Sequence, residues 1–402
     1  MSKINEAWSF IENKLFYPKT NLFYECRVSD DEDALICHLP SPELIKKQIP
    51  NPAGWSTGME DGPLTAGMVL DGLLARYETE PSEEIIVFAR KILEGMKTCA
   101  TISDSPGFLV RSVSPVDGKT HYMNSSRDQY THFVYSACLY YNMPFATDEE
   151  KAFIRKALCS FADRAERNVT EEKQWNMRRE DDGFAIVTTM WGTLGKHEYF
   201  RLPMLYAGAY YVSGDEKYMK LYRKFRDEAF EKTASIEPEK FEHPSMISQM
   251  MYSLRLAYDV DPDTDFKARC LALMQRMAEY GKKKAVEFSQ KYCTDAYRET
   301  FDRKLLPWDQ VMKAEFVGVF DGYAYYNHLQ LNDFESARWI LLGETGAAMC
   351  YVLCPGLPYD KELEDALLKM IDFIDYNKHY TVGPTGLMGA YHTLLALKRT
   401  EN

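Results

Sequence analysis

Long apolar runs are missing from this chain of 402 residues. Even the apolar stretch Ile340–Leu353 is interrupted by Glu344 and by glycines, so no segment reaches the roughly 18 consecutive apolar residues that predict a membrane span. The first six residues, MSKINE, have neither the basic segment nor the apolar core of a secretory signal. We therefore expect no membrane partner and a cytoplasmic location, or a periplasmic one if an export signal has been cleaved.

Basic residues are fewer than acidic residues. Lys and Arg number 48 against 60 Asp and Glu, which leaves a formal net charge of −12. A surface of this sign repels phosphate backbones and anionic lipid. Nucleic acid is therefore not expected as a partner.

Several common enzyme signatures are absent as well. The chain has no phosphate-binding or dinucleotide-binding glycine motif, no HExxH helix and no GxSxG turn. Its nine cysteines are an odd number, which predicts free thiols in a reducing compartment rather than a disulfide framework. Cys350 and Cys354 stand at helical spacing without a second ligand pair nearby, so buried thiols are favoured over a zinc site. We expect no cofactor and no metal.

The chain does contain enough apolar surface for a large core, with 46% hydrophobic and 13% aromatic residues. Apolar positions recur at helical spacing almost throughout, and turn signals such as the capping box of Thr147 and Glu150 separate the segments in pairs. The expected pairs are 64–78 with 85–96, 127–142 with 151–167, 199–212 with 216–230, 245–258 with 266–281, 315–329 with 334–353, and 361–376 with 387–399.

This architectural repeat explains the length of the chain without several domains. The first helix of a pair is rich in Gly, Ala, Tyr and Met, whereas the second carries more Lys, Arg and Glu on one face. The first helices are therefore expected to be buried and the second ones to face solvent. The sequence predicts an all-α fold, an (α/α)6 barrel formed by residues 1–402 as a single domain. An open α-solenoid is the alternative, because helix pairs alone do not prove closure.

Three long connections interrupt the pattern, residues 17–63, 103–126 and 168–198. They contain glycines, prolines, tryptophans and charged residues, and such connections commonly carry the chemistry of a helical scaffold.

A family resemblance lies in and beside these connections. The segments 17–24 (YPKTNLFY), 54–62 (GWSTGMEDG) and 125–130 (SSRDQY) resemble the six-hairpin glycosidase superfamily, with unsaturated glucuronyl hydrolases and related uronic-acid-specific glycosidases the most similar members. The resemblance implies an (α/α)6 barrel that binds sugars at one end of the inner ring and uses an aspartate as general acid or base. It matches a superfamily rather than one enzyme.

Two aspartates are the candidate catalytic residues. Asp61 precedes the helix expected from residue 64, and Asp128 begins the helix expected from residue 127. Carboxylates at these positions also stabilise the positive end of a helix dipole or cap its amides, which is the ordinary explanation. Equivalent positions on successive inner helices, however, place both carboxylates at the same end of a barrel. Glycoside hydrolysis needs such a pair, one to protonate the leaving oxygen and one to activate water or attack.

The remaining candidates share a position in or beside the long connections. A guanidinium matches a substrate carboxylate, a histidine carries protons near neutral pH, and a tryptophan stacks on sugar rings. The ordinary alternatives are surface ion pairs for the arginines, core packing for the histidines and a plug of the barrel mouth for the tryptophans. The expected substrate-binding residues are Glu60, Trp55, Arg127, His132, Trp191, His197, Glu198 and Arg201.

Together these patterns predict a glycoside hydrolase that removes a terminal uronic-acid residue, glucuronyl or unsaturated glucuronyl, from an oligosaccharide. Asp61 and Asp128 would share the acid and base roles, and an arginine would hold the substrate carboxylate. A sugar epimerase or polysaccharide lyase on the same barrel is one alternative. A helical-repeat binding protein without catalytic activity is another.

Overall fold

The computed structural model describes residues 2–24, 39–55, 57–240, 244–296, 315–320, 323–327, 346–376 and 383–400. Helices dominate, and the strands form two short antiparallel pairs. The helices are α1 (Lys3–Phe10), α2 (Pro42–Lys46), α3 (Gly62–Thr79), α4 (Glu83–Thr101), α5 (Arg127–Tyr141), α6 (Asp148–Asn168), α7 (Arg201–Ser213), α8 (Glu216–Ala234), α9 (Pro244–Val260), α10 (Thr264–Lys291), α14 (Lys361–Phe373) and α15 (Gly383–Thr400). A π-helical turn spans Ile11–Leu15, a 3-10 turn spans Pro238–Lys240, and residues 346–352 are also helical.

The inner helices are buried on nearly all sides because small residues allow their backbones to approach closely. A Cβ atom on Gly67 of α3 would lie 2.8 Å from the carbonyl oxygen of His132 on α5. On the other flank of α3, Gly72 faces Gly389 of α15 at a similarly short separation. These glycines of α3 and α15 therefore allow close contact between inner helices.

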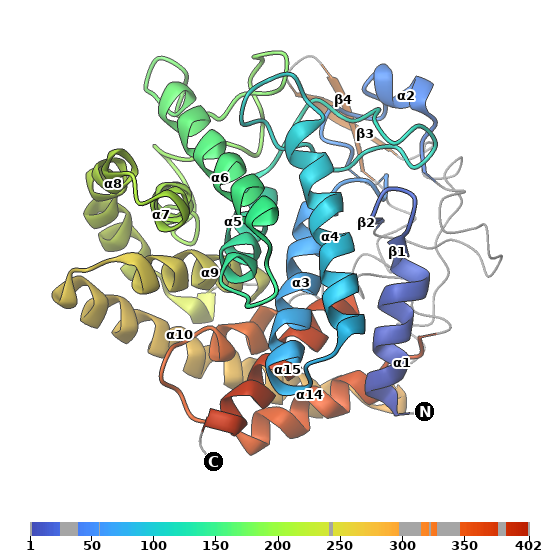
Figure 1. Ribbon diagram of the computed structural model, residues 1–402, viewed down its shortest axis with the longest axis vertical. Helices are drawn as coiled ribbons and strands as arrows, with labels where there is room; N and C mark the ends of the chain where they lie inside the picture. The colour runs from blue at the N-terminus through green and yellow to red at the C-terminus, as the bar shows by residue number, and fades with distance from the viewer. Residues whose placement is uncertain are drawn as a thin grey trace.

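These inner helices close into a ring. Helix α3 packs against α5 and α15, α5 against α7, and α7 against α9. Residues 346–352 fill the interval between α9 and α15, since Gly346 lies against Ser245 and Gly389 lies close to Met349. The predicted (α/α)6 barrel is confirmed, and the open solenoid is excluded by the contact of α15 with α3 (Figure 1).

The outer helices are amphipathic and bury one face on this ring. Helix α4, for example, buries Ile85, Phe88, Ile92 and Met96 at helical spacing. Helix α6 begins with the expected capping box, in which Thr147 and Glu150 satisfy each other's backbone amides. These caps and apolar faces reproduce the predicted second helices of the pairs.

The last pair corrects the sequence-based prediction. Helix α14, expected as the first and inner member, is an outer helix that packs against α10 and α15. Helix α15 is the inner member, and the N-terminal helix α1 packs beside it and against α14. Trp8 of α1 donates a hydrogen bond of 2.9 Å from its indole nitrogen to Nε2 of His392 on α15. The last helix pair of the ring therefore consists of α15 as the inner helix and α1 as the outer helix, which come from opposite ends of the chain.

The prediction of a helix at residues 315–329 is wrong. Strands β3 (Glu315–Phe320) and β4 (Tyr323–Asn327) pair there as an antiparallel hairpin, so the tyrosines of β4 do not lie on an inner helix. The sequence contains the reason, because aromatic and β-branched residues favour strands and the intervening dipeptide Asp321-Gly322 favours a tight hairpin turn. Of the helix expected at 334–353, residues 346–352 are helical, and residues 334–345 lie outside the described residues.

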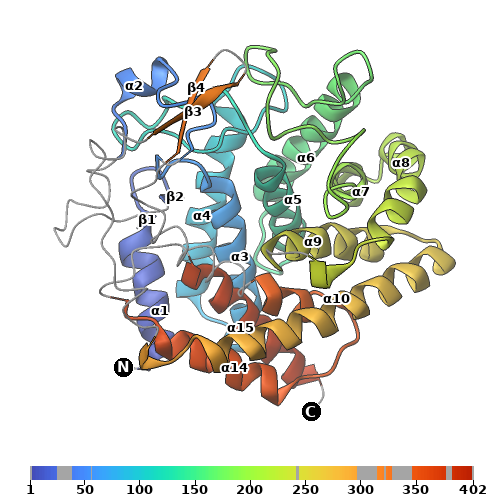
Figure 2. The same ribbon diagram turned by 180° about the vertical axis from the view of Figure 1, so that it is seen from behind.

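The two ends of the barrel differ. The long connections enter the inner helices at their N-terminal ends, and both views show α2 and the β3–β4 hairpin at that same end (Figures 1 and 2). A second small hairpin, β1 (Phe16–Tyr17) with β2 (Leu22–Phe23), contacts α3 and α4. The two chain termini lie toward the other end (Figure 2). Within the described residues, none of the helices has the length and apolarity to cross a membrane.

Candidate functional site

Asp61 lies at the N-terminal end of α3, and its carboxylate does not cap its own helix. Oxygen Oδ1 accepts hydrogen bonds from Nη2 of Arg111 at 3.0 Å and from Nε2 of Gln129 at 2.7 Å. Arg111 and Gln129 also both donate to the backbone carbonyl of Glu60. Gln129 is fixed in turn because its own oxygen accepts from the backbone N–H of Leu64 at 3.1 Å. This network ties the first turn of α5 to the first turn of α3.

Asp128 lies one helix further round the ring, in the first turn of α5. Ser126, not Asp128, is the N-cap residue of that helix. The Asp128 carboxylate forms an ion pair with Arg201 at the start of α7, and its side chain is 39% exposed whereas that of Arg201 is 2% exposed. Arg201 also donates to the side-chain oxygen of Gln249 on α9. One arginine therefore connects the entrances of three inner helices.

The charges around Asp128 keep it ionised. Removal from bulk water raises the pKa of a carboxyl group, but the cations of Arg201 and Arg127 outweigh this effect, and the pKa of Asp128 lies below its ordinary value. Asp128 is therefore an ionised carboxylate that is still reachable from solvent.

Arg127, Glu198 and His197 complete this part of the site. Arg127 forms an ion pair with Glu198 and donates from Nη1 to the carbonyl of Thr189 at 2.9 Å. Burial lowers the pKa of His197 to about 4, and the neighbouring Arg201 acts in the same direction. His197 is therefore a neutral imidazole near neutral pH.

His132 lies one turn after Asp128 on α5 and is 3% exposed. Its ring packs edge-on against Tyr252 of α9 with the ring centres 4.8 Å apart. Burial lowers its pKa to about 4, and the charges of Asp128, Arg201 and Asp61 all act on the same imidazole. Its Nδ1 atom has no hydrogen-bond partner among the described residues. The charges of both candidate aspartates therefore act on one neutral histidine.

Two predicted residues lie apart from these contacts. Trp191 is 7% exposed and packs against Phe225 of the outer helix α8 with ring centres 4.8 Å apart. Lys232 of the same helix covers the indole ring at 5.2 Å. Trp55 lies in the loop before α3, where its backbone N–H donates to Asn51 at 3.1 Å. The structure gives Trp191 a packing role, and neither tryptophan joins the carboxylate cluster through the contacts described above.

Gln129, Gln249 and Tyr252 also belong to the site, although the sequence did not predict them. Gln129 follows Asp128 directly in the SSRDQY segment and carried a usable signal. Gln249 and Tyr252 lie within α9, and only their position in the ring brings them to the site. Metal binding has no visible basis here: within the part of the chain that is described, no group of three or more His, Cys, Asp or Glu side chains converges.

The charges of the site are balanced in pairs. Arg111 pairs with Asp61, Arg201 with Asp128 and Arg127 with Glu198. The other two arginines of the third long connection are likewise matched, Arg178 with Asp182 at 3.9 Å and Arg179 with Asp181 at 2.8 Å. Each of these arginines already has a carboxylate partner within the protein.

Comparisons with known proteins find only distant similarity. No family model matches the sequence, and no curated protein matches it significantly. Among solved structures the chain is similar to a sugar epimerase from a ruminal bacterium (12% identity, 88% of this chain and 99% of that chain, TM-score 0.45). It is also similar to a family 76 glycoside hydrolase, a mannosidase, from Bacteroides thetaiotaomicron (10%, 100% and 100%, 0.49). A third similar structure is the cellobiose 2-epimerase from Bacillus thermoamylovorans (14%, 80% and 90%, 0.41). At such identities a shared chain path does not establish a shared substrate or reaction.

Proposed function

We propose that the protein is a glycoside hydrolase whose active site lies at the N-terminal ends of the inner helices. The observation that carries this proposal is the state of Asp128, an ionised carboxylate that keeps 39% of its side chain exposed. Asp61 completes the pair, because its charge acts on the same histidine as that of Asp128. Most glycoside hydrolases cleave the glycosidic bond with a pair of carboxyl groups.

The surroundings of the two carboxyl groups support a division of roles within the pair. Asp128 is the base, since Arg201 and Arg127 stabilise its charged form and a base must be ionised to accept a proton from water. Asp61 is the partner that protonates the leaving oxygen. Both Arg111 and Gln129 donate to its Oδ1 atom, which fixes the orientation of this carboxyl group.

The charge balance favours an uncharged sugar at this site. A uronic acid would need a cation to receive its carboxylate, yet Arg111, Arg127 and Arg201 each already hold a protein carboxylate. A substrate carboxylate would therefore share its cation with a protein carboxylate, and two negative charges close together repel each other. Removal of a terminal uronic acid, the activity that the resemblance implied, is therefore the second choice of substrate.

Epimerisation of a reducing sugar is the second candidate reaction, and His132 favours it. An epimerase removes a proton from the carbon beside the sugar carbonyl, and a neutral imidazole with a nitrogen available for bonding suits that step. His132 is neutral near pH 7 and its Nδ1 atom has no partner among the described residues. In this reaction the carboxylates would only position the sugar.

Product analysis separates the two reactions. Nitrophenyl glycosides of neutral hexoses and nitrophenyl glucuronides would be tested for nitrophenolate release, and reducing disaccharides in heavy water for deuterium uptake at C2. We expect release from a neutral hexoside, a fall in kcat of about 10²- to 10⁴-fold in Asp128→Asn, and activity retained in His132→Asn. Deuterium uptake that depends on His132 but not on Asp128 would refute hydrolysis.

A matched control is available on an outer helix. Asp372 of α14 is exposed, so Asp372→Asn carries the same chemical change without touching the site. This variant should retain full activity with the same glycosides. Faster release from glucuronides than from neutral hexosides would overturn the charge argument while leaving the hydrolase assignment intact.

A further inference from the structure

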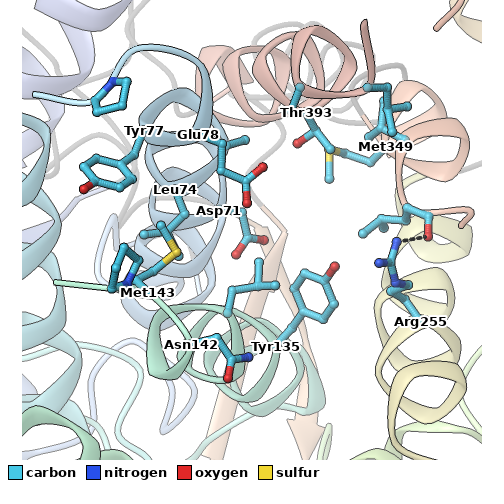
Figure 3. Close-up of a pocket in the computed structure, with 18 residues that line it drawn as sticks. Asp71, Leu74, Tyr77, Glu78, Tyr135, Asn142, Met143, Arg255, Met349 and Thr393 are labelled. Atoms are coloured by element: carbon cyan, nitrogen blue, oxygen red, sulfur yellow. Dashed lines mark hydrogen bonds between the residues drawn. The ribbon is translucent and has the colours of Figure 1, made fainter. Parts of the chain in front are cut away.

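A separate cavity of about 670 Å³ lies between the C-terminal halves of the inner helices. Its walls come from α3, α5, α9, residues 346–352 and α15, so five inner helices contribute (Figure 3). Leucine, methionine, alanine and proline side chains form most of this lining. The cavity is large enough for a small organic molecule.

Asp71 lies at the inner end of this cavity. It is the tenth residue of the α3 span Gly62–Thr79, so it lies about 15 Å along the helix axis from Asp61 at 1.5 Å per residue. The two sites are therefore distinct. Figure 3 shows the Asp71 carboxylate directed toward the open space between Tyr135 and Glu78.

Asp71 is an unusual residue for its position. It is 5% exposed, and neither of its carboxylate oxygens has a hydrogen-bond partner among the described residues. Burial raises the pKa of Asp71 well above its ordinary value, and the nearby hydroxyl of Tyr252 opposes this only in part without completing a hydrogen bond. A buried carboxyl group left unpaired destabilises a fold. An oppositely charged ligand would remove that cost.

The surroundings of Asp71 define the ligand's chemistry. Tyr135 and Tyr77 contribute aromatic rings to the lining, and aromatic faces attract organic cations. Arg255 is the one cationic side chain in the lining, and its charge is met by Asp259 at 2.8 Å, while it also donates to the carbonyl of Leu353. Asp71 and Glu78 are the carboxyl groups of the lining. Burial raises the pKa of both, and a bound cation would favour their ionised forms.

We propose that this cavity is a second ligand site, which binds a small organic cation with an apolar body and uses Asp71 as the counter-ion of its ammonium group. The apolar walls contact the body of the ligand, and the ring of Tyr135 lines the cavity that holds its charged group. This proposal does not depend on the proposed hydrolase activity. A binding measurement tests it, so either proposal can fail without the other.

Calorimetric titration with three indoles tests the charge requirement. Tryptamine, tryptophol and indole-3-acetate share one ring system and differ in carrying a cationic, a neutral and an anionic end group. We expect tryptamine to bind at least about tenfold more tightly than tryptophol, since a charged hydrogen bond is worth more than a neutral one, and indole-3-acetate to bind more weakly still. Equal affinities, or no binding of tryptamine, would overturn the proposal.

Two variants locate the binding. Asp71→Asn keeps the shape of the side chain and should remove the preference for tryptamine over tryptophol. Ala396→Trp adds a large ring at a partly exposed lining position of α15 and should abolish binding of both indoles, so it serves as the test if Asp71→Asn fails to fold. Asp372→Asn is the matched control. Tryptamine binding that survives both Asp71→Asn and Ala396→Trp would refute this location.

Discussion

Replacing Asp71 with leucine should stabilise the protein. The change removes a carboxyl group that is 5% exposed and has no hydrogen-bond partner among the described residues, a defect that costs about 1–3 kcal/mol. It adds an apolar side chain whose burial is worth about 1.5–3 kcal/mol. The adjoining cavity provides room for the extra atoms, so overpacking does not offset these gains. We expect the free energy of unfolding to increase by at least about 2.5 kcal/mol, the sum of the two lower limits.

The effect of pH provides an independent check on Asp71→Leu. The pKa of Asp71 is raised in the folded state, so the unfolded chain ionises this group first as pH rises. The wild-type penalty is therefore absent below the unfolded pKa of about 3.9 and grows as pH rises above it. The advantage of the leucine variant should be smaller in acid than at neutral pH.

Urea unfolding at several pH values measures both effects, with an unchanged m-value as the sign that the same surface is exposed. Asp372→Leu is the control, because Asp372 is exposed on α14 and such surface changes stay within about 0.5 kcal/mol. If Asp71→Leu lowers the free energy of unfolding, Asp71 has stabilising partners within the fold. The carboxyl group is then not unpaired, and the ligand site proposed around it is refuted.

Three further outcomes test packing, capping and charge. Thr147→Ala removes the hydroxyl of the α6 capping box and should lower the free energy of unfolding by about 1 kcal/mol; no change in urea unfolding would mean that the box is not formed. Gly281→Ala places a Cβ atom 2.2 Å from the carbonyl oxygen of Ala347 and should cost about 1–3 kcal/mol, whereas a neutral result would contradict the close approach of α10 to the ring. Because the pKa of Asp128 is lowered in the folded state, its ion pair with Arg201 stabilises the protein above the ordinary carboxyl pKa and is lost as pH falls through the folded value. The difference in unfolding free energy between wild type and Asp128→Asn should therefore shrink in acid, and a difference that widens there would show that the pair does not stabilise the fold.

The sequence predicted the elements that local patterns define. The apolar stripes of α4 and the capping box of Thr147 and Glu150 lie where expected, because both depend on residues three or four positions apart. The glycines and aromatics of residues 315–329 resemble those of the inner helices and favour a helix there. Strand preference and hairpin pairing decide that segment instead.

The candidate site was predictable only in part. The positions of Asp61 and Asp128 at the entrances of successive inner helices follow from the repeat, and the structure places both there. Their partners follow from the ring itself, since Arg201 and Gln249 are 73 and 48 residues away from the groups they join. Asp71 carried no signal in the sequence, and the packing of α5, α9 and α15 around α3 is what places it at a cavity.

The pairing of α1 with α15 affects how the chain is made. Helix α3 packs against α15, and Trp8 bonds to His392, 384 residues further along. During synthesis the N-terminal segment therefore emerges long before its partner, and the flank of α3 that α15 will cover stays exposed until α15 itself has left the ribosome. Contacts of such long range slow folding and leave apolar surface open to association. Chains halted before α15 is complete are expected to be the most aggregation-prone species of this protein.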